Sequence, residues 1–268
     1  IAVSPDGHGG SLRALARSGA LDHAADRGVK HLSYFQVDNP TVHAIDPLFI
    51  GLHANHPASS GEMSSKMVPK IAAGEKVGVF CSVSDRTRVI EYSDLPVKHA
   101  TATTEDGSLR FIAGSIAIHI LAVDFIDRLT TAGSETAMPF HLARKKVPFW
   151  DPKNGETVNP PEPNGTKFEM FVFDALEFVD QGLVYETDRV EEFAPIKNAD
   201  GGDSAKSSGQ LQTERAARWM EVAGSKVARN EDGTVNGQIE ILASTALSAA
   251  DLEAGSCPEL APGSQLVF

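Results

Sequence analysis

Helical and extended segments alternate along most of the 268-residue chain, and this alternation limits the possible folds more than any other feature. Clusters of β-branched and aromatic residues predict strands at residues 31–37, 76–83, 87–92, 109–113 and 183–187. Helical spacing of apolar residues predicts helices at residues 11–16, 21–27, 124–132, 168–179 and 210–223. Such alternation is typical of an α/β fold with helices on both faces of a sheet.

The texture of the sequence changes near residues 224–233, which are rich in turn-forming residues. Beyond them the segments are short and β-prone, as at residues 238–242. We therefore predict a large α/β domain over residues 1–223 and a small β-rich domain over residues 234–268.

Charge and cysteine content narrow the classes of partner. Asp and Glu number 36 against 24 Lys and Arg, a net charge of −12, which disfavours binding to nucleic acid. The two cysteines, Cys81 and Cys257, are too far apart in sequence to indicate a disulfide framework or a CxxC site, so we expect a cytoplasmic protein. The most apolar stretch, residues 111–123, is too short to span a membrane, and we expect no membrane partner.

A glycine-rich segment, SPDGHGG, occupies residues 4–10. Three glycines around His8 would let the backbone approach a flat ligand, with exposed N–H groups as donors. The spacing matches neither a Walker loop nor GxGxxG, and taken alone the segment is better explained as a plain turn before a helix.

Two further segments place carboxylates where predicted strands end. Asp38 follows residues 31–37, and it could hold Mg²⁺ on substrate phosphates or simply form a turn with Asn39 and Pro40. Glu91 and Tyr92 could bind sugar hydroxyls, or could belong to an edge strand that faces water.

Single lysines and aromatic residues are weaker signals. Lys167 and Lys197 could pair with phosphate, although most lysines are solvated surface residues. Phe171 and Phe173 suit a core as well as a pocket wall. The histidines form no zinc motif and no Gly-x-Ser-x-Gly elbow is present, so neither a zinc site nor serine hydrolysis is predicted.

Taken together, these segments resemble one family in wording and order. The matching stretches are SPDGHGG, VDNP, DPLFIG, KVGVFCSV, VIEYSDLP, IAGSIAIH, HLARKKVP, PNGTKFEMFVFDALEF and EEFAPIKNADG. They resemble the UDP-N-acetylglucosamine pyrophosphorylases, within the wider UDP-sugar pyrophosphorylase group. The resemblance implies a Rossmann-like nucleotide-sugar transferase sheet and a small C-terminal β domain.

The resemblance also implies a reaction. UTP and N-acetylglucosamine 1-phosphate would give UDP-N-acetylglucosamine and pyrophosphate with Mg²⁺ as cofactor, through in-line attack on the α-phosphorus. Positioning and charge neutralisation would carry the catalysis. The alternatives are a pyrophosphorylase for glucose or galactose 1-phosphate and a non-catalytic relative that binds sugar nucleotides.

By its motifs, the resemblance assigns roles to individual residues. Gly7, Asp38 and Lys167 would bind UTP, with Asp38 also at the metal, and Lys197 would pair with the sugar phosphate, so that Asp38 and Lys197 are the expected catalytic residues. The remaining sugar-site residues would be His8, Gly78, Glu91, Tyr92, Ser115, Phe171 and Phe173.

Two departures fall at substrate-facing positions. Where the family commonly has Asn, this chain has His8 and Ser115, and the shorter serine offers one donor in place of two. The family's phosphate loop, a GGxGTRLG run followed by Pro-Lys, is absent from the 268 residues. We therefore expect the natural protein to start upstream of Ile1, and residues 1–268 alone not to turn over UTP.

Overall fold

The computed structural model describes residues 5–131 and 138–268, which form two units. Unit 1 comprises residues 1–34 and 45–186, and unit 2 comprises residues 35–44 and 187–268, each apart from any undescribed residues. This division differs from the predicted boundary near residues 224–233. The reason lies in unit 2, where Ala217 and Met220 of the long helix pack against Ile239 and Leu260 and join the C-terminal segment to that helix.

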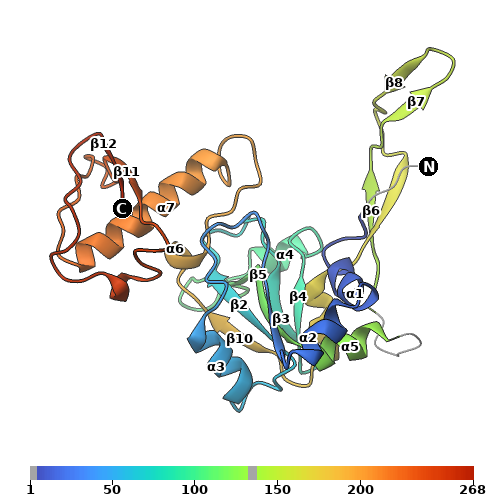
Figure 1. Cartoon of the computed structure of the whole chain (residues 1–268). Coiled ribbons are helices and arrows are strands. Elements are labelled where there is room, and N and C mark those ends of the chain that lie inside the picture. Colours follow the sequence, from blue (N-terminus) through green and yellow to red (C-terminus); the bar gives the residue numbers. More distant parts are fainter. Residues whose placement is uncertain (1–4, 132–137) are drawn as a thin grey trace. The chain divides into compact units, whose positions relative to one another are not determined.

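A mixed sheet organises unit 1 (Figure 1). Its strands are β1 (His31–Tyr34), β2 (Met63–Pro69), β3 (Val79–Val83), β4 (Arg86–Ile90), β5 (Ala113–Ala122) and β10 (Leu183–Glu186). Strand β5 is central, because one edge pairs with β2 while the other pairs with β3 near its start and with β1 near its end. Only β10 and β2 run parallel among these pairs, and the others are antiparallel.

Helices cover both faces of this sheet, as the sequence predicts. The helices of unit 1 are α1 (Gly10–Arg17), α2 (Ala20–Asp26), α3 (Pro47–Asn55), α4 (Val97–Ala100), α5 (Val123–Thr130) and the 3₁₀ helix η1 (Val172–Phe178). Side chains alternate across a strand, so Met63 and Ser64 of β2 face opposite sides. Met63 joins the core with α1, α5 and η1, whereas Ser64 bonds to His53 of α3 at 2.9 Å.

A β-bulge interrupts the central strand. Ser65 pairs with His119 and Met67 pairs with Ser115, so three residues of β5 lie opposite Lys66 alone. The middle one, Ala117, has φ of 55°, a left-handed conformation that non-glycine residues seldom adopt. Bulges bend a strand and redirect its side chains, here between Ser115 and His119.

The predicted helix at residues 168–179 is wrong over its first four residues. Residues Gly165–Glu169 form strand β9, which pairs antiparallel with β6 (His141–Lys145), and η1 begins only at Val172. The helical spacing of the apolar residues is overridden by this pairing with a segment at least twenty residues away. A second hairpin, β7 (Phe149–Asp151) with β8 (Glu156–Val158), connects β6 to β9.

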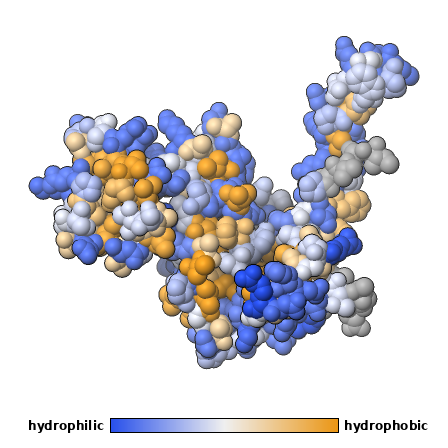
Figure 2. Space-filling view, in the orientation of Figure 1, coloured by the Kyte–Doolittle hydropathy of each residue, from blue (hydrophilic) through white to orange (hydrophobic). Residues whose placement is uncertain are grey.

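Unit 2 is built around one long helix. Its elements are α6 (Arg189–Glu192), α7 (Ala205–Val222), β11 (Gly237–Glu240), the 3₁₀ helix η2 (Ala249–Asp251) and β12 (Ser264–Val267). Strands β11 and β12 run parallel. Figure 2 shows hydrophobic residues at the surface of this unit, and large exposed ones in its C-terminal segment are Leu242, Leu247 and Val267.

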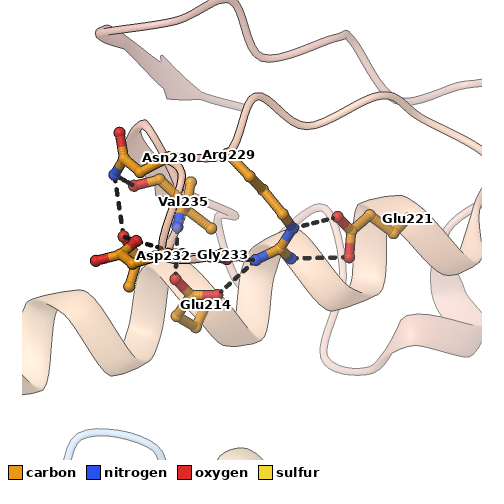
Figure 3. A network of polar contacts seen from close by, with 8 residues as sticks. Glu214, Glu221, Arg229, Asn230, Asp232, Gly233 and Val235 are labelled. Atoms are coloured by element: carbon orange, nitrogen blue, oxygen red, sulfur yellow. Dashed lines mark hydrogen bonds and ion pairs between the residues drawn. The ribbon is translucent and has the colours of Figure 1, made fainter.

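An arginine fastens the loop after α7 to the helix (Figure 3). The guanidinium of Arg229 donates to both carboxylate oxygens of Glu221 at 2.9 Å, and also to Glu214 at 3.1 Å. Glu214 in turn accepts the N–H of Val235 at 2.7 Å.

Within residues 5–131 and 138–268, no helix is both long and apolar enough to cross a bilayer.

Candidate functional site

The glycine-rich turn lies against the end of β9. The N–H of Met170 donates to the Asp6 carbonyl at 2.7 Å, and the N–H of Gly9 donates to the Met170 carbonyl at 2.8 Å. A Cβ on Gly7 would meet the Met170 backbone, and one on Gly9 would lie 2.7 Å from the Met170 carbonyl carbon. Gly7 also has φ of 85°. Packing of backbone on backbone therefore accounts for these glycines without a ligand.

His8 is the side chain that this turn presents to the rest of the unit. Its ring stacks on Phe171 with centroids 5.1 Å apart and meets the edge of Phe173 at 5.7 Å. Its Nδ1 accepts the N–H of Val172 at 3.1 Å. Burial lowers the pKa of His8 to about 4, and the nearby Glu169 opposes this only in part. The imidazole is therefore neutral near pH 7, with its proton on Nε2.

A second histidine lies behind this group. His119 of β5 is fully buried, shares a hydrogen bond with Ser65 Oγ at 2.8 Å, and stacks on Tyr34 at 5.7 Å. Burial, together with the charge of His8, lowers the pKa of His119 to about 3. Its Nε2 is buried and has no hydrogen-bond partner within the described parts of the chain.

The other end of the bulge gathers three predicted sugar-site residues. The N–H of Ser115 donates to the Gly78 carbonyl at 2.8 Å. A Cβ on Gly78 would lie 3.4 Å from Oε1 of Glu91, so this carboxylate passes close to the glycine. Tyr92, the next residue, is 47% exposed. Strand geometry separates Ser115 from His119 by no more than about 13 Å.

Lys167 lies on β9 and is already paired. Its Nζ is 2.8 Å from Glu169 Oε1, and both side chains are roughly three-quarters buried. A phosphate would have to share this lysine with Glu169.

Asp38 and Lys197 lie together in unit 2. Asn39 bonds to the backbone of Glu192 at 2.7 Å and of Ala194 at 3.0 Å, and the Asp38 carbonyl accepts the N–H of Ile196 at 2.8 Å. These bonds bring Asp38 beside the residue preceding Lys197. Asp38 is not at the end of β1 as predicted, because that strand stops at Tyr34 and residues 35–44 belong to unit 2.

Sequence reasoning brought forward most of these residues but missed five neighbours. These neighbours contact His8, Phe171 or one another, and they are Tyr34, Ser65, His119, His141 and Asp174. His119 carried a usable signal, since an ionisable residue within an apolar strand calls for a partner. Ser65 and Asp174 carried none, because their roles depend on contacts across the sheet.

Known proteins resemble this chain over most of its length. UDP-N-acetylglucosamine pyrophosphorylase from Saccharomyces cerevisiae is 36% identical over 231 residues, which are 85% of this chain and 48% of that protein. UDP-N-acetylhexosamine pyrophosphorylase-like protein 1 from Xenopus tropicalis is 39% identical over 203 residues, 76% of this chain and 39% of that protein.

A solved structure agrees with these relatives. The uridine diphosphate N-acetylglucosamine pyrophosphorylase from Trypanosoma brucei, crystallised with an inhibitor, superposes with a TM-score of 0.72 at 25% identity, covering 93% of this chain and 50% of that one. The chain thus spans about half the length, or less, of these relatives. Residues 2–226 match the family described as UTP–glucose-1-phosphate uridylyltransferase. Since that match takes in most of the chain and the fold agrees, the chain belongs to this uridylyltransferase family.

Proposed function

We propose that the protein transfers a uridylyl group from UTP to N-acetylglucosamine 1-phosphate and releases pyrophosphate. The observation that carries the proposal is the arrangement around the bulge of β5. At one end the Glu91 carboxylate lies near Gly78, whose carbonyl accepts the N–H of Ser115. At the other end the Tyr34 ring contacts both His119 and His8, and His8 stacks on Phe171. Carboxylate and hydroxyl groups suit sugar hydroxyls, while aromatic faces suit the apolar face of a hexose ring. The names of the Saccharomyces and Trypanosoma proteins include the same sugar, and the name of the Xenopus protein includes the wider class of N-acetylhexosamines.

In this reaction a phosphate oxygen of the sugar 1-phosphate attacks the α-phosphorus of UTP in line. The bond from that phosphorus to the bridging oxygen breaks, and pyrophosphate leaves with the electron pair. No side-chain nucleophile is required, so the protein acts by alignment and by neutralising charge. Lys197, whose side chain is exposed, would pair with the sugar phosphate, and Lys167 with the phosphates of the nucleotide.

Asp38 fits a magnesium ion that is shared with substrate. Mg²⁺ in phosphoryl-transfer sites uses one or two carboxylates and takes its other ligands from phosphate oxygens and water. The Asp38 backbone is fixed by Ile196, while its carboxylate has no hydrogen bond or ion pair with the described residues. When bound, the ion would neutralise charge on the triphosphate, and Asp38 would hold it.

His8 would supply one hydrogen bond to the sugar side. Because its Nδ1 accepts from Val172, its Nε2–H is the donor, and the lowered pKa keeps this donor uncharged. The Asn that is usual in the family at this position offers an amide that both donates and accepts. Histidine can only donate there, so we propose that it contacts a hydroxyl or carbonyl oxygen of the sugar.

The proposed setting is a cytoplasmic protein that acts on small molecules. Both cysteines are unpaired, which is consistent with a reducing compartment. UTP and a hexosamine 1-phosphate would be its partners, and the acidic net charge argues against nucleic acid.

A substrate panel tests the proposal. The full-length protein is mixed with UTP, Mg²⁺ and the 1-phosphates of N-acetylglucosamine, N-acetylgalactosamine, glucose and galactose, and pyrophosphate release is measured. We expect the highest kcat/KM with N-acetylglucosamine 1-phosphate. Glu91→Gln should lower it strongly, whereas Glu105→Gln, a change at an exposed position in another loop, should not.

Other outcomes would replace the proposal. A preference for glucose or galactose 1-phosphate would change the substrate and keep the reaction. Tight binding of UDP-N-acetylglucosamine without pyrophosphate release from any sugar would indicate a non-catalytic binding protein.

A further inference from the structure

Phe171 is held by its backbone as well as by its ring. Its N–H donates to Oδ2 of Asp174 at 3.2 Å, and its carbonyl accepts the N–H of Asp174 at 3.1 Å. One residue therefore binds both polar groups of the Phe171 backbone. This closes the turn that leads into η1 and fixes the direction in which the Phe171 side chain leaves the backbone.

His141 completes the arrangement from another strand. Its Nε2 lies 2.8 Å from the same Oδ2 of Asp174, and its ring centroid is 4.6 Å from that of Phe171. The phenyl ring of Phe171 thus has His141, His8 and Phe173 as neighbours, with centroids within 5.1 Å. His141 is the first residue of β6, so the β6–β9 pair and η1 meet at this contact.

The Asp174 carboxylate is placed where a carboxylate is costly. Its side chain is only 7% exposed, and burial raises its pKa, which the hydrogen bond and charge of His141 partly offset. A buried carboxylate is tolerated when donors surround it, and here His141 and Phe171 both donate. Removing either donor leaves the buried carboxylate with fewer hydrogen bonds to offset the loss of water around it.

We propose that His141 and Asp174 form a positioning pair that holds Phe171 as a wall of the sugar site. This proposal rests on the proposed function for the identity of the ligand. The fixing of Phe171 by His141 and Asp174, here called the clamp, rests on the contacts alone. His141 acts through Asp174 and through the ring of Phe171, and it does not touch the reacting atoms. Its loss should weaken sugar binding while leaving the chemical step and nucleotide binding largely unchanged.

Two substitutions separate the two contacts of His141. His141→Phe keeps a ring against Phe171 but removes the donor to Asp174, and His141→Gln keeps an amide donor but removes the ring. Asp174→Asn tests the carboxylate directly. Leu142→Ala is the matched control, because Leu142 is the next residue of β6 and is 67% exposed on the opposite face.

The first measurement needs no activity. In the ¹⁵N-phenylalanine-labelled chain, the Phe171 amide is assigned by its loss in Phe171→Leu. Its resonance should move in His141→Phe and in Asp174→Asn, and stay in place in Leu142→Ala. An unmoved resonance in both would overturn the clamp.

The second measurement is kinetic, in the full-length protein. His141→Phe should raise KM for the sugar 1-phosphate on the order of tenfold, with kcat and the UTP KM within about twofold of the parent. His141→Gln should recover part of that loss. An unchanged sugar KM, or equal losses in kcat and both KM values, would overturn the proposal in favour of a merely structural pair. A parent protein without transferase activity would contradict the proposed function, and the Phe171 amide would still judge the clamp.

Discussion

Nδ1 of His8 accepts the backbone N–H of Val172 at 3.1 Å, and this single contact decides which nitrogen of the ring carries the proton. A neutral imidazole has one donor and one acceptor, so Nε2 is the donor. Burial keeps the ring neutral by lowering its pKa to about 4. His8 thus behaves as an uncharged N–H group of fixed direction, although its usual pKa would make it sensitive to physiological pH.

This state of His8 can be observed directly. In a ¹⁵N-histidine spectrum of the protein, we expect the His8 ring to show the Nε2–H tautomer at pH 7 and to remain neutral down to about pH 5. His23, exposed on α2, serves as a reference within the same spectrum. A His8 resonance that reports Nδ1–H, or that titrates near the usual pKa of 6.5, would contradict the assignment.

Ser115 should loosen the choice of sugar. A site that hydrogen-bonds a substrate group rejects analogues that lack it, and serine offers fewer such bonds than asparagine. A water in the space left by the shorter side chain would retain affinity and weaken discrimination. We expect N-acetylglucosamine 1-phosphate to exceed its N-acetylgalactosamine and glucose counterparts by roughly one to two orders of magnitude in kcat/KM, and Ser115→Asn to widen the gap.

The control for this change is Ser108→Asn, in an exposed loop. The ratio of kcat/KM values for competing sugar 1-phosphates tests whether Ser115 contacts the sugar. A parent that already discriminates by roughly 10⁴, or a Ser115→Asn variant with the parent's ratio, would mean that Ser115 does not contact the sugar.

Asp38 is expected to set the magnesium requirement. In the full-length protein, Asp38→Asn should lower the rate strongly and shift the Mg²⁺ titration to higher concentration, because an amide is a weaker ligand than a carboxylate. The fold should survive, since the backbone carbonyl bonded to Ile196 is retained. Asp200→Asn, at an exposed position of the same unit, is the control. Superimposable Mg²⁺ titrations of Asp38→Asn and the parent would make Asp38 a turn residue only.

Buried histidines should make the fold sensitive to mild acid. Burial lowers the pKa of His53 to about 4 and that of His119 to about 3, and both side chains are fully buried. The unfolded chain binds protons near pH 6.5 while the folded one does not, so stability rises with pH across this range. The contribution of the neutral histidines to the free energy of unfolding is fully present above about pH 6.5. It is lost as the pH falls toward 4, by up to about 1.4 kcal/mol per pH unit for each histidine.

Urea unfolding between pH 4 and 8 measures this slope. His53→Asn should flatten it at the cost of some stability, since Ser64 loses a well-placed partner. Gln210→Ala, a change at an exposed position without a titratable group, should leave the slope as it is. A parent whose stability does not change between pH 6.5 and 4 would contradict the assignment of neutral buried histidines.

Local sequence patterns predicted the elements whose formation depends on residues close together in the sequence. The glycine turn, the strands at residues 183–187 and the long helix near residues 210–223 were predictable, because turn residues and apolar spacing act over a few residues. The α/β class followed from their alternation, and the structure confirms it.

Contacts between distant segments were beyond such reasoning. Gly78, Glu91 and Ser115 lie close together only because β3, β4 and β5 are neighbours in the sheet. The last two residues of strand Gly165–Glu169 were predicted as helix, because the pairing of this strand with β6 leaves no mark on its own spacing. Likewise, the place of residues 35–44 in unit 2 depends on Asn39, whose bonds reach across more than 150 residues.

The contact between the glycine turn and Met170 has an evolutionary consequence. Gly7 and Gly9 are required by the strand end they rest on, so related proteins could exchange one sugar for another and keep both glycines. His8 lies between the two glycines, and its side chain packs on the Phe171 ring and not on the strand end. Drift at this one position could therefore alter substrate preference while the surrounding turn, and the fold it anchors, stay the same.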